Sequence, residues 1–229
     1  MEKKTIRLIY PQWQGGDIAR WIPEVDDPRD VARGYALGAQ MLAMLAPGKD
    51  VETHVVPVSM DASDRRVTDG VLDRDTIALQ TRAALDIVRG AAPDRIVTLG
   101  GECSVSVVPF TYLLHRYGGD VALVWIDAHP DITLPGDAYA GYHAMAVTAC
   151  MGLGDGRILS CLPARFEASK ILFVGLRDWE RDEIRLRQQQ YGICHLSPAD
   201  IAAGLDGLRQ WLRTCGASRV AVHFDMDVL

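Results

Sequence analysis

The chain has 229 residues, of which 48% are hydrophobic and 24% are charged, and its formal net charge is −6. Its Lys and Arg residues form no run or stripe, so the composition argues against nucleic acid and anionic membrane surfaces as partners and favours a small-molecule substrate. The apolar content suffices for one large core or two small ones, and a single domain over residues 1–229 is the simpler interpretation.

The N-terminus and the cysteines predict a soluble protein with reduced thiols. No apolar run typical of a signal peptide follows Met1, and no segment reaches the roughly 18 consecutive apolar residues of a membrane span. The five cysteines are odd in number and form no C-x-x-C pair, which argues against a disulfide framework. We therefore expect a cytoplasmic location.

Strand-like and helix-like segments alternate along the chain. In order, we expect strands at residues 5–10, 52–58, 95–99, 120–126, 170–174, 193–196 and 219–225. We expect helices at residues 30–46, with Asp30 as a possible N-cap, and at 73–89, 104–117, 181–191 and 205–214. This alternation predicts an α/β fold, a three-layer αβα sandwich with a mainly parallel central sheet. Residues 12–28 and 131–142 are rich in Gly, Pro and Asp and are expected to be long loops, the second forming the rim of a ligand site.

Two short segments carry the strongest chemical signal. Both follow an apolar strand and place acidic or histidine residues two positions apart, so that these side chains can share one face. The residues in question are Asp127, His129 and Asp131 in the first segment, and Asp225 and Asp227 in the second. Ligands of parallel α/β sheets lie outside the carboxyl ends of the strands, so both segments should meet at the same edge.

Carboxylates that converge in this way predict a metal site. Four of them cannot all ionise in a dry pocket unless cations lie among them. Two divalent metals resolve the conflict, and manganese suits a carboxylate-rich pair. Helix capping by the acidic residues is the alternative, but it does not explain five residues with matched spacing. His223 shares the face of Asp225, and we expect it to support the ligands from behind.

These motifs resemble the signatures of the ureohydrolases, the family of arginase, agmatinase and formiminoglutamase. The family carries Gly-Gly-Asp-His-Ser, Asp-Ala-His-x-Asp and Ser-x-Asp-x-Asp segments. This chain has Gly100-Gly-Glu-Cys-Ser104, Asp127-Ala-His-Pro-Asp131 and His223-Phe-Asp-Met-Asp227 at the corresponding places. The resemblance implies a hydrolase that cleaves C–N bonds of a linear guanidino or amidino compound with a hydroxide bridging two manganese ions. It also implies a homo-oligomer.

The resemblance assigns the metal ligands residue by residue. Asp127 and Asp225 would bridge the two manganese ions. Asp131 would complete one site, and His129 and Asp227 would complete the other.

The resemblance also implies catalytic and substrate-binding roles. His143 lies where the family carries a histidine that shuttles protons, although a structural histidine in a solvated loop is the alternative. Either Asp131 or His143 would protonate the departing amine. Asp178 and Glu180 lie in a segment that faces the substrate in arginases, where the second residue is usually Asp. The longer Glu180 side chain argues against a copy of arginase specificity.

Cys103 is the main departure from the family pattern, because it occupies the position of a histidine ligand. It could bind metal as a thiolate and favour a softer ion. It could instead be a neutral thiol beside a half-empty site that leaves one metal. Alternatively, the site could bind little metal and the protein could be a non-catalytic, arginase-like ligand-binding or assembly protein.

The segment after the third motif is a second departure. Family members continue through a further strand and helix that carry a substrate-binding glutamate, whereas this sequence stops at Leu229. A core strand in that position would leave an apolar surface and an unpaired backbone edge exposed. Either the chain is a shortened product or another chain covers the edge, and we do not expect the 229-residue form to turn over substrate. The sequence does not choose among arginine, agmatine, formiminoglutamate and other guanidino compounds.

Overall fold

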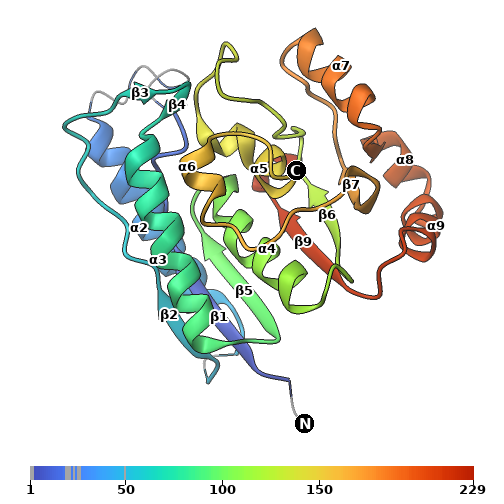
Figure 1. Ribbon diagram of the computed structural model, residues 1–229, viewed down its shortest axis with the longest axis horizontal. Coiled ribbons are helices and arrows are strands. Elements are labelled where there is room, and N and C mark those ends of the chain that lie inside the picture. The colour runs from blue at the N-terminus through green and yellow to red at the C-terminus, as the bar shows by residue number, and fades with distance from the viewer. Residues whose placement is uncertain (1–2, 19–21, 23, 25–26, 49) are drawn as a thin grey trace.

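Parallel β-strands form the centre of the protein (Figure 1). The structure is a computed structural model that describes residues 3–18, 22, 24, 27–48 and 50–229. Its strands are β1 (Thr5–Tyr10), β2 (Glu52–Val55), β3 (Val67–Thr68), β4 (Val71–Leu72), β5 (Arg95–Gly100), β6 (Ala122–Ile126), β7 (Ile171–Val174), β8 (Cys194–Leu196) and β9 (Val220–Phe224). They form a parallel sheet of order β2-β1-β5, a second parallel sheet of order β8-β7-β6-β9, and the small antiparallel pair β3-β4.

Helices connect these strands and cover both faces of the sheets. The α-helices are α2 (Pro28–Leu45), α3 (Arg74–Ala91), α4 (Val107–Arg116), α5 (Ala146–Cys150), α6 (Gly156–Leu159), α7 (Asp182–Tyr191), α8 (Pro198–Ala203) and α9 (Asp206–Thr214). Four 3₁₀ helices are also described, namely η1 (Cys103–Ser106), η2 (Tyr142–Met145), η3 (Ala168–Lys170) and η4 (Met226–Val228). The predicted α/β sandwich with parallel strands is thereby confirmed.

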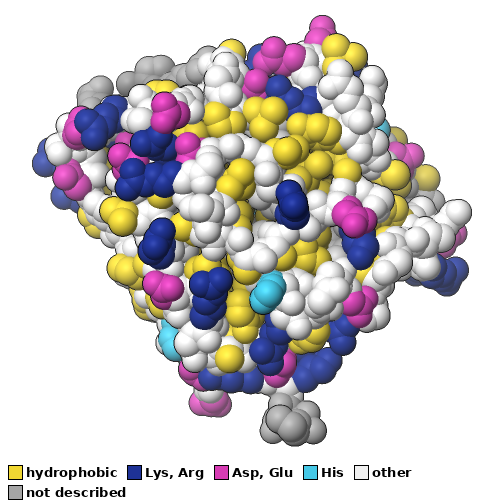
Figure 2. Space-filling view, in the orientation of Figure 1, with side chains coloured by type: hydrophobic (Ala, Val, Ile, Leu, Met, Phe, Trp, Pro, Cys, Tyr) yellow, Lys and Arg dark blue, Asp and Glu magenta, His cyan; other side chains and the backbone are white. Residues whose placement is uncertain are grey.

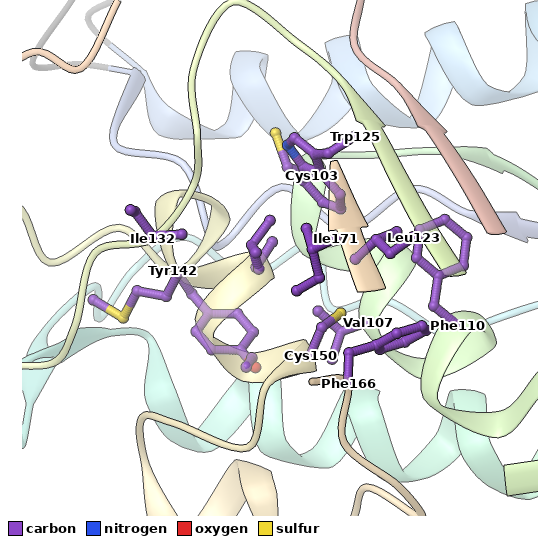
Figure 3. Close-up of a cluster of buried hydrophobic side chains, with 14 of the residues drawn as sticks. Cys103, Val107, Phe110, Leu123, Trp125, Ile132, Tyr142, Cys150, Phe166 and Ile171 are labelled. Atoms are coloured by element: carbon purple, nitrogen blue, oxygen red, sulfur yellow. The ribbon is translucent and has the colours of Figure 1, made fainter. Parts of the chain in front are cut away.

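The central strand β6 explains how the second sheet is buried on both faces. Leu123 and Trp125 point to one side, where they join a large apolar cluster that includes Phe110 of α4 (Figure 3). Val124 points to the other side and packs in a cluster with Trp211 of α9. Alternate residues of one strand therefore contact different helical layers, as the continuous apolar run predicts.

The first sheet follows the same rule. Leu8 of β1 packs with Leu85 of α3, while Arg7 points the opposite way and donates hydrogen bonds to the carbonyls of Ala43 and Pro47 at the end of α2. Arg7 is buried, and these carbonyls supply the partners that a buried guanidinium requires.

Several predicted boundaries shift in the structure. The N-cap of α2 is Asp27 rather than Asp30, because the Asp27 carboxylate accepts a hydrogen bond from the Arg29 amide. The strand predicted at residues 52–58 ends at Val55. The predicted loop at residues 12–28 lies partly outside the described residues.

Two further elements lie outside the predicted set, although both have local signals. The β3-β4 hairpin turns at Asp69 and Gly70, both with positive φ, as an Asp-Gly pair favours. Helix α8 begins with a capping box between Ser197 and Asp200.

Strands β5 and β9 end their respective sheets, and both present apolar side chains to solvent. Val97 of β5 is 48% exposed, and Val222 and Phe224 of β9 are 53% and 54% exposed. A groove of about 440 Å³ is lined by residues of both strands and by Phe110 of α4. Among the described residues, β9 pairs with β6 alone.

The surface carries charges of both signs. On the face shown in Figure 2, Lys and Arg side chains are interspersed with Asp and Glu side chains. Within the described part of the chain, no helix is both long and apolar enough to cross a membrane.

Replacing Leu123 tests the core of the second sheet. Leu123 is fully buried, so Leu123→Ala should lower the free energy of unfolding by about 2–5 kcal/mol through the cavity that it leaves. Leu79→Ala is the matched control, because Leu79 is 65% exposed and its loss should cost less than about 0.5 kcal/mol. Urea denaturation followed by circular dichroism measures both. A similar, small loss in both variants would contradict the described core.

Candidate metal centre

The loops after β1 and β5 are fixed against each other at the edge of the sheet where both strands end. Gly101 passes so close to the first loop that a Cβ atom there would lie 2.3 Å from the Gln12 carbonyl oxygen. The Glu102 amide donates to the same carbonyl at 2.9 Å. Only glycine allows this approach, which sets the position of the residues that follow.

Glu102 anchors the start of η1. It is buried, and its carboxylate accepts hydrogen bonds from Gln12 Nε2 at 2.6 Å and from the Ser104 amide and hydroxyl, both at 2.8 Å. Burial raises its pKa, and these donors oppose that effect. Glu102 is not among the site residues predicted from the sequence, but in the structure it orients the segment that carries Cys103.

Asp127 lies at the end of β6 and is held by two donors. Trp125 Nε1 donates to Asp127 Oδ2 at 3.0 Å, and the His129 amide donates to Oδ1 at 2.7 Å. Burial by itself would raise the pKa of Asp127, but the neighbouring imidazoles of His129 and His223 outweigh that effect and hold the pKa below its ordinary value. Asp127 is therefore an ionised carboxylate in a buried position.

Asp131 is buried in a strained conformation. Its φ angle is 48°, and its Oδ2 atom has no hydrogen-bond partner among the residues that the structure describes. Burial and the charges of Asp127 and Asp225 raise its pKa well above the ordinary value. Both the left-handed backbone conformation and the buried oxygen without a partner cost free energy, and features of this kind are typical of functional sites.

Asp225 and Asp227 follow β9 and face the end of β6. The Asp225 amide donates to the Ile126 carbonyl at 2.9 Å, and the Ala128 amide donates to Asp227 Oδ1 at 3.2 Å. Asp227 Oδ2 also lies 3.0 Å from His129 Nδ1. The interaction with Asp127, together with the charge of Asp227, raises the pKa of His129 to about 9 despite burial.

Cys103 lies directly beside these carboxylates. Its Sγ atom donates to Asp225 Oδ2 at 3.2 Å. Burial, reinforced by the charges of Asp131 and Asp127, raises the pKa of the thiol well above its ordinary value.

The structure thus brings together all six residues predicted as metal ligands. Their donor atoms, with those of His143 and His223, form three overlapping groups, which are Cys103/Asp127/His223/Asp225, Cys103/Asp131/His143 and Asp127/His129/Asp227.

His143 lies in the wall of the same pocket. Its Nε2 atom is 2.8 Å from the Tyr139 hydroxyl, and its amide donates to the Gly15 carbonyl at 3.2 Å. Burial and the charge of His129 lower the pKa of His143 to about 4. The imidazole is therefore neutral at neutral pH.

Asp178 and Glu180 lie at the rim. The Asp178 side chain is 60% exposed, with Oδ2 4.0 Å from His129 Nε2. The Glu180 amide donates to Asp178 Oδ1 at 2.7 Å. Both residues line a cavity of about 780 Å³ whose floor contains the carboxylates and Cys103. Ile132 and Thr133, from the loop predicted to form the rim, line it as well.

His223 lies beside the carboxylates. Its Nε2 atom lies 3.6 Å from Asp127 Oδ2 and, like Asp131 Oδ2, lacks a hydrogen-bond partner within the described residues. Two unpartnered, buried polar atoms in a set of carboxylate, imidazole and thiol donors fit a pocket that binds divalent cations.

Comparisons with known proteins identify the family. The family model of the arginase family matches residues 38–229. The arginase of Eremothecium gossypii is 32% identical over 154 residues, which make up 63% of this chain and 38% of that protein. The arginase of Entamoeba histolytica is 28% identical over 137 residues, 58% of this chain and 46% of that protein. The matched regions therefore span less than half the length of these relatives.

Solved structures share the fold. The crystal structure of Entamoeba histolytica arginase in complex with L-ornithine has a TM-score of 0.74 at 18% identity, and the match covers 98% of this chain and 76% of that chain. The formimidoylglutamase of Bacillus subtilis has a TM-score of 0.63 at 14% identity, with 100% and 66% covered. The family match over most of the sequence, the arginase-like fold and the residues gathered at the strand ends lead to one conclusion: the chain belongs to the arginase family.

Proposed function

We propose that the protein is a metal-dependent hydrolase that cleaves a C–N bond of a small, linear guanidino or amidino compound. The observation that carries this proposal is the convergence of four carboxylates and His129 on the floor of one cavity, at the strand ends of an arginase-family chain. The likeness to arginases and to a formimidoylglutamase supports this substrate class. As part of the same proposal, the enzyme acts as a cytoplasmic homo-oligomer.

The chain's own residues define where metal and substrate would lie. The carboxylates of Asp127, Asp131, Asp225 and Asp227 and the imidazole of His129 would hold two divalent ions. Manganese suits the carboxylate-rich half of this set. When bound, the ions would activate water for attack on the planar carbon of the substrate.

The remaining residues would position the substrate and move protons. A guanidinium or amidinium cation would be attracted by the carboxylates of the floor and by Asp178 and Glu180 at the rim. Neutral His143, beside the Tyr139 hydroxyl, would take up a proton and deliver it to the departing amine. The products would be an amine and urea from a guanidino compound, or an amine and formamide from a formimino compound.

Replacing one of the converging carboxylates tests the proposed metal centre. Asp225→Ala should lower the total content of bound divalent metal and abolish hydrolysis, because it removes a carboxylate from the donor set of the floor. Metal content after manganese loading and dialysis, and release of urea, formamide or ammonia from a panel of guanidino and formimino compounds, measure the two effects.

The matched control is Asp206→Asn, which alters a carboxylate that is 97% exposed on α9. It should retain both metal and activity. Full activity in Asp225→Ala would contradict the proposed mechanism. A wild-type chain that binds metal but hydrolyses nothing in the panel would favour a non-catalytic ligand-binding relative.

Replacing His143 separates proton transfer from metal binding. His143→Asn should lower kcat by about 10²–10⁴-fold, the usual contribution of a general acid or base, and should leave the manganese content unchanged. Steady-state kinetics and metal analysis of the same sample measure this. His115→Gln, an exposed histidine on α4, is the control and should not change the rate. Normal kcat in His143→Asn would exclude it as the proton carrier.

A further inference from the structure

The pocket contains one group of side chains that differs in chemistry from the rest. The donor atoms of Cys103, Asp127, His223 and Asp225 all lie within 4.8 Å of one another. They come from three elements, since Cys103 opens η1, Asp127 follows β6, and the other two belong to β9 and the residue after it. Sulfur, imidazole nitrogen and two carboxylates therefore face one point.

His223 is oriented as a metal-ligating histidine would be. Its Nδ1 atom lies 2.9 Å from the Ser106 hydroxyl, and its ring stacks on Trp125 with a centroid distance of 3.6 Å and an interplanar angle of 11°. When the Ser106 oxygen accepts a hydrogen bond from Nδ1, the lone pair of Nε2 remains available. Ligating histidines are typically fixed through their second ring nitrogen in this way.

The Nε2 atom of His223 points toward the other donors without a partner of its own. The residue is only 7% exposed, and no described residue offers Nε2 a hydrogen bond. Its 3.6 Å separation from Asp127 Oδ2 is too long for a hydrogen bond but leaves space for an ion between the two atoms. A buried ring nitrogen without a partner costs free energy, which a bound cation would recover.

We propose that His223, Cys103, Asp127 and Asp225 form a site for one borderline divalent ion of the zinc class. Four ligands that supply sulfur, nitrogen and oxygen match the tetrahedral sites that zinc and cobalt occupy. Manganese prefers oxygen ligands, so a site with a thiolate discriminates against it. His223 is then a ligand instead of a supporting residue, and Cys103 binds as the thiolate after releasing its proton to solvent.

The carboxylate and imidazole donors outside this site favour harder ions. His129 and Asp227 form an overlapping group with Asp127 that contains no sulfur, so the two halves of the pocket differ in metal preference. This inference depends on the proposed function only in that the pocket binds metal, and it does not require turnover.

Cobalt substitution of the full chain tests the site. Co²⁺ titrated into metal-free protein should give tetrahedral visible bands and a near-ultraviolet thiolate-to-cobalt band that saturate together at one equivalent. One equivalent of Zn²⁺ should remove the bands, and the same amount of Mn²⁺ should not. Absorption without the thiolate band would overturn the proposal.

Two variants assign the ligands. Cys103→Ser should lose the thiolate band, whereas Cys150→Ser, a buried cysteine of α5 outside the pocket, should retain it. His223→Phe keeps a ring against Trp125 but removes the ligand, and it should weaken cobalt binding by at least about tenfold. Unchanged affinity in His223→Phe, with the metal-free fold verified by circular dichroism, would overturn the assignment.

A measurement on the unaltered chain covers the case in which His223→Phe does not fold. X-ray absorption at the zinc edge of protein with one bound equivalent should show one sulfur and one imidazole per ion. A shell without sulfur would overturn the proposal. A thiolate band without hydrolysis would support this metal site and contradict the proposed hydrolase function. Hydrolysis without the thiolate band would support the hydrolase function and contradict this metal site.

Discussion

The crowding of negative charge at the shared ends of β6 and β9 is the constraint on which the site depends. Asp127 and Asp131 are almost fully buried, and Asp225 and Cys103 are in hydrogen-bond contact beside them. Such a set is unfavourable in a dry pocket unless positive charge balances it. His129 supplies part of that charge, the Trp125 indole adds a hydrogen bond to Asp127, and divalent cations would supply the rest of the charge.

The surrounding structure holds this crowded set in place. Parallel pairing of β6 with β9 brings the two acidic motifs level with each other, because Ile126 pairs with Phe224 at the end of the ladder. On the other side, the Glu102 carboxylate is fixed by Gln12 and Ser104 and sets the position of Cys103. Gly101 allows the two loops to approach closely enough for this contact. The chemistry thus depends on close packing between loops that are distant in the sequence.

Part of the fold was predictable because its signals are local. The buried strands β6 and β7 have continuous apolar runs that leave little alternative, and the Thr5–Tyr10 strand is found with the predicted bounds. The N-cap of α2 was misplaced because Asp27 and Asp30 are equally suitable residue types, and only the hydrogen bond to the Arg29 amide distinguishes them. The Asp69-Gly70 turn and the Ser197 capping box also have local sequence signals, so both were predictable.

The sequence by itself determined the α/β class and the residues that gather at the sheet edge, because apolar periodicity and the position of a residue after a strand are local properties. Only the tertiary structure decided what those residues contact. Cys103 and Asp225 belong to different motifs and are 122 positions apart in the sequence, yet Cys103 Sγ lies 3.2 Å from Asp225 Oδ2. The orientation of His223 depends on Trp125 and Ser106, which belong to other elements. Contacts of this kind arise from packing, so the spacing of residues along the chain does not specify them.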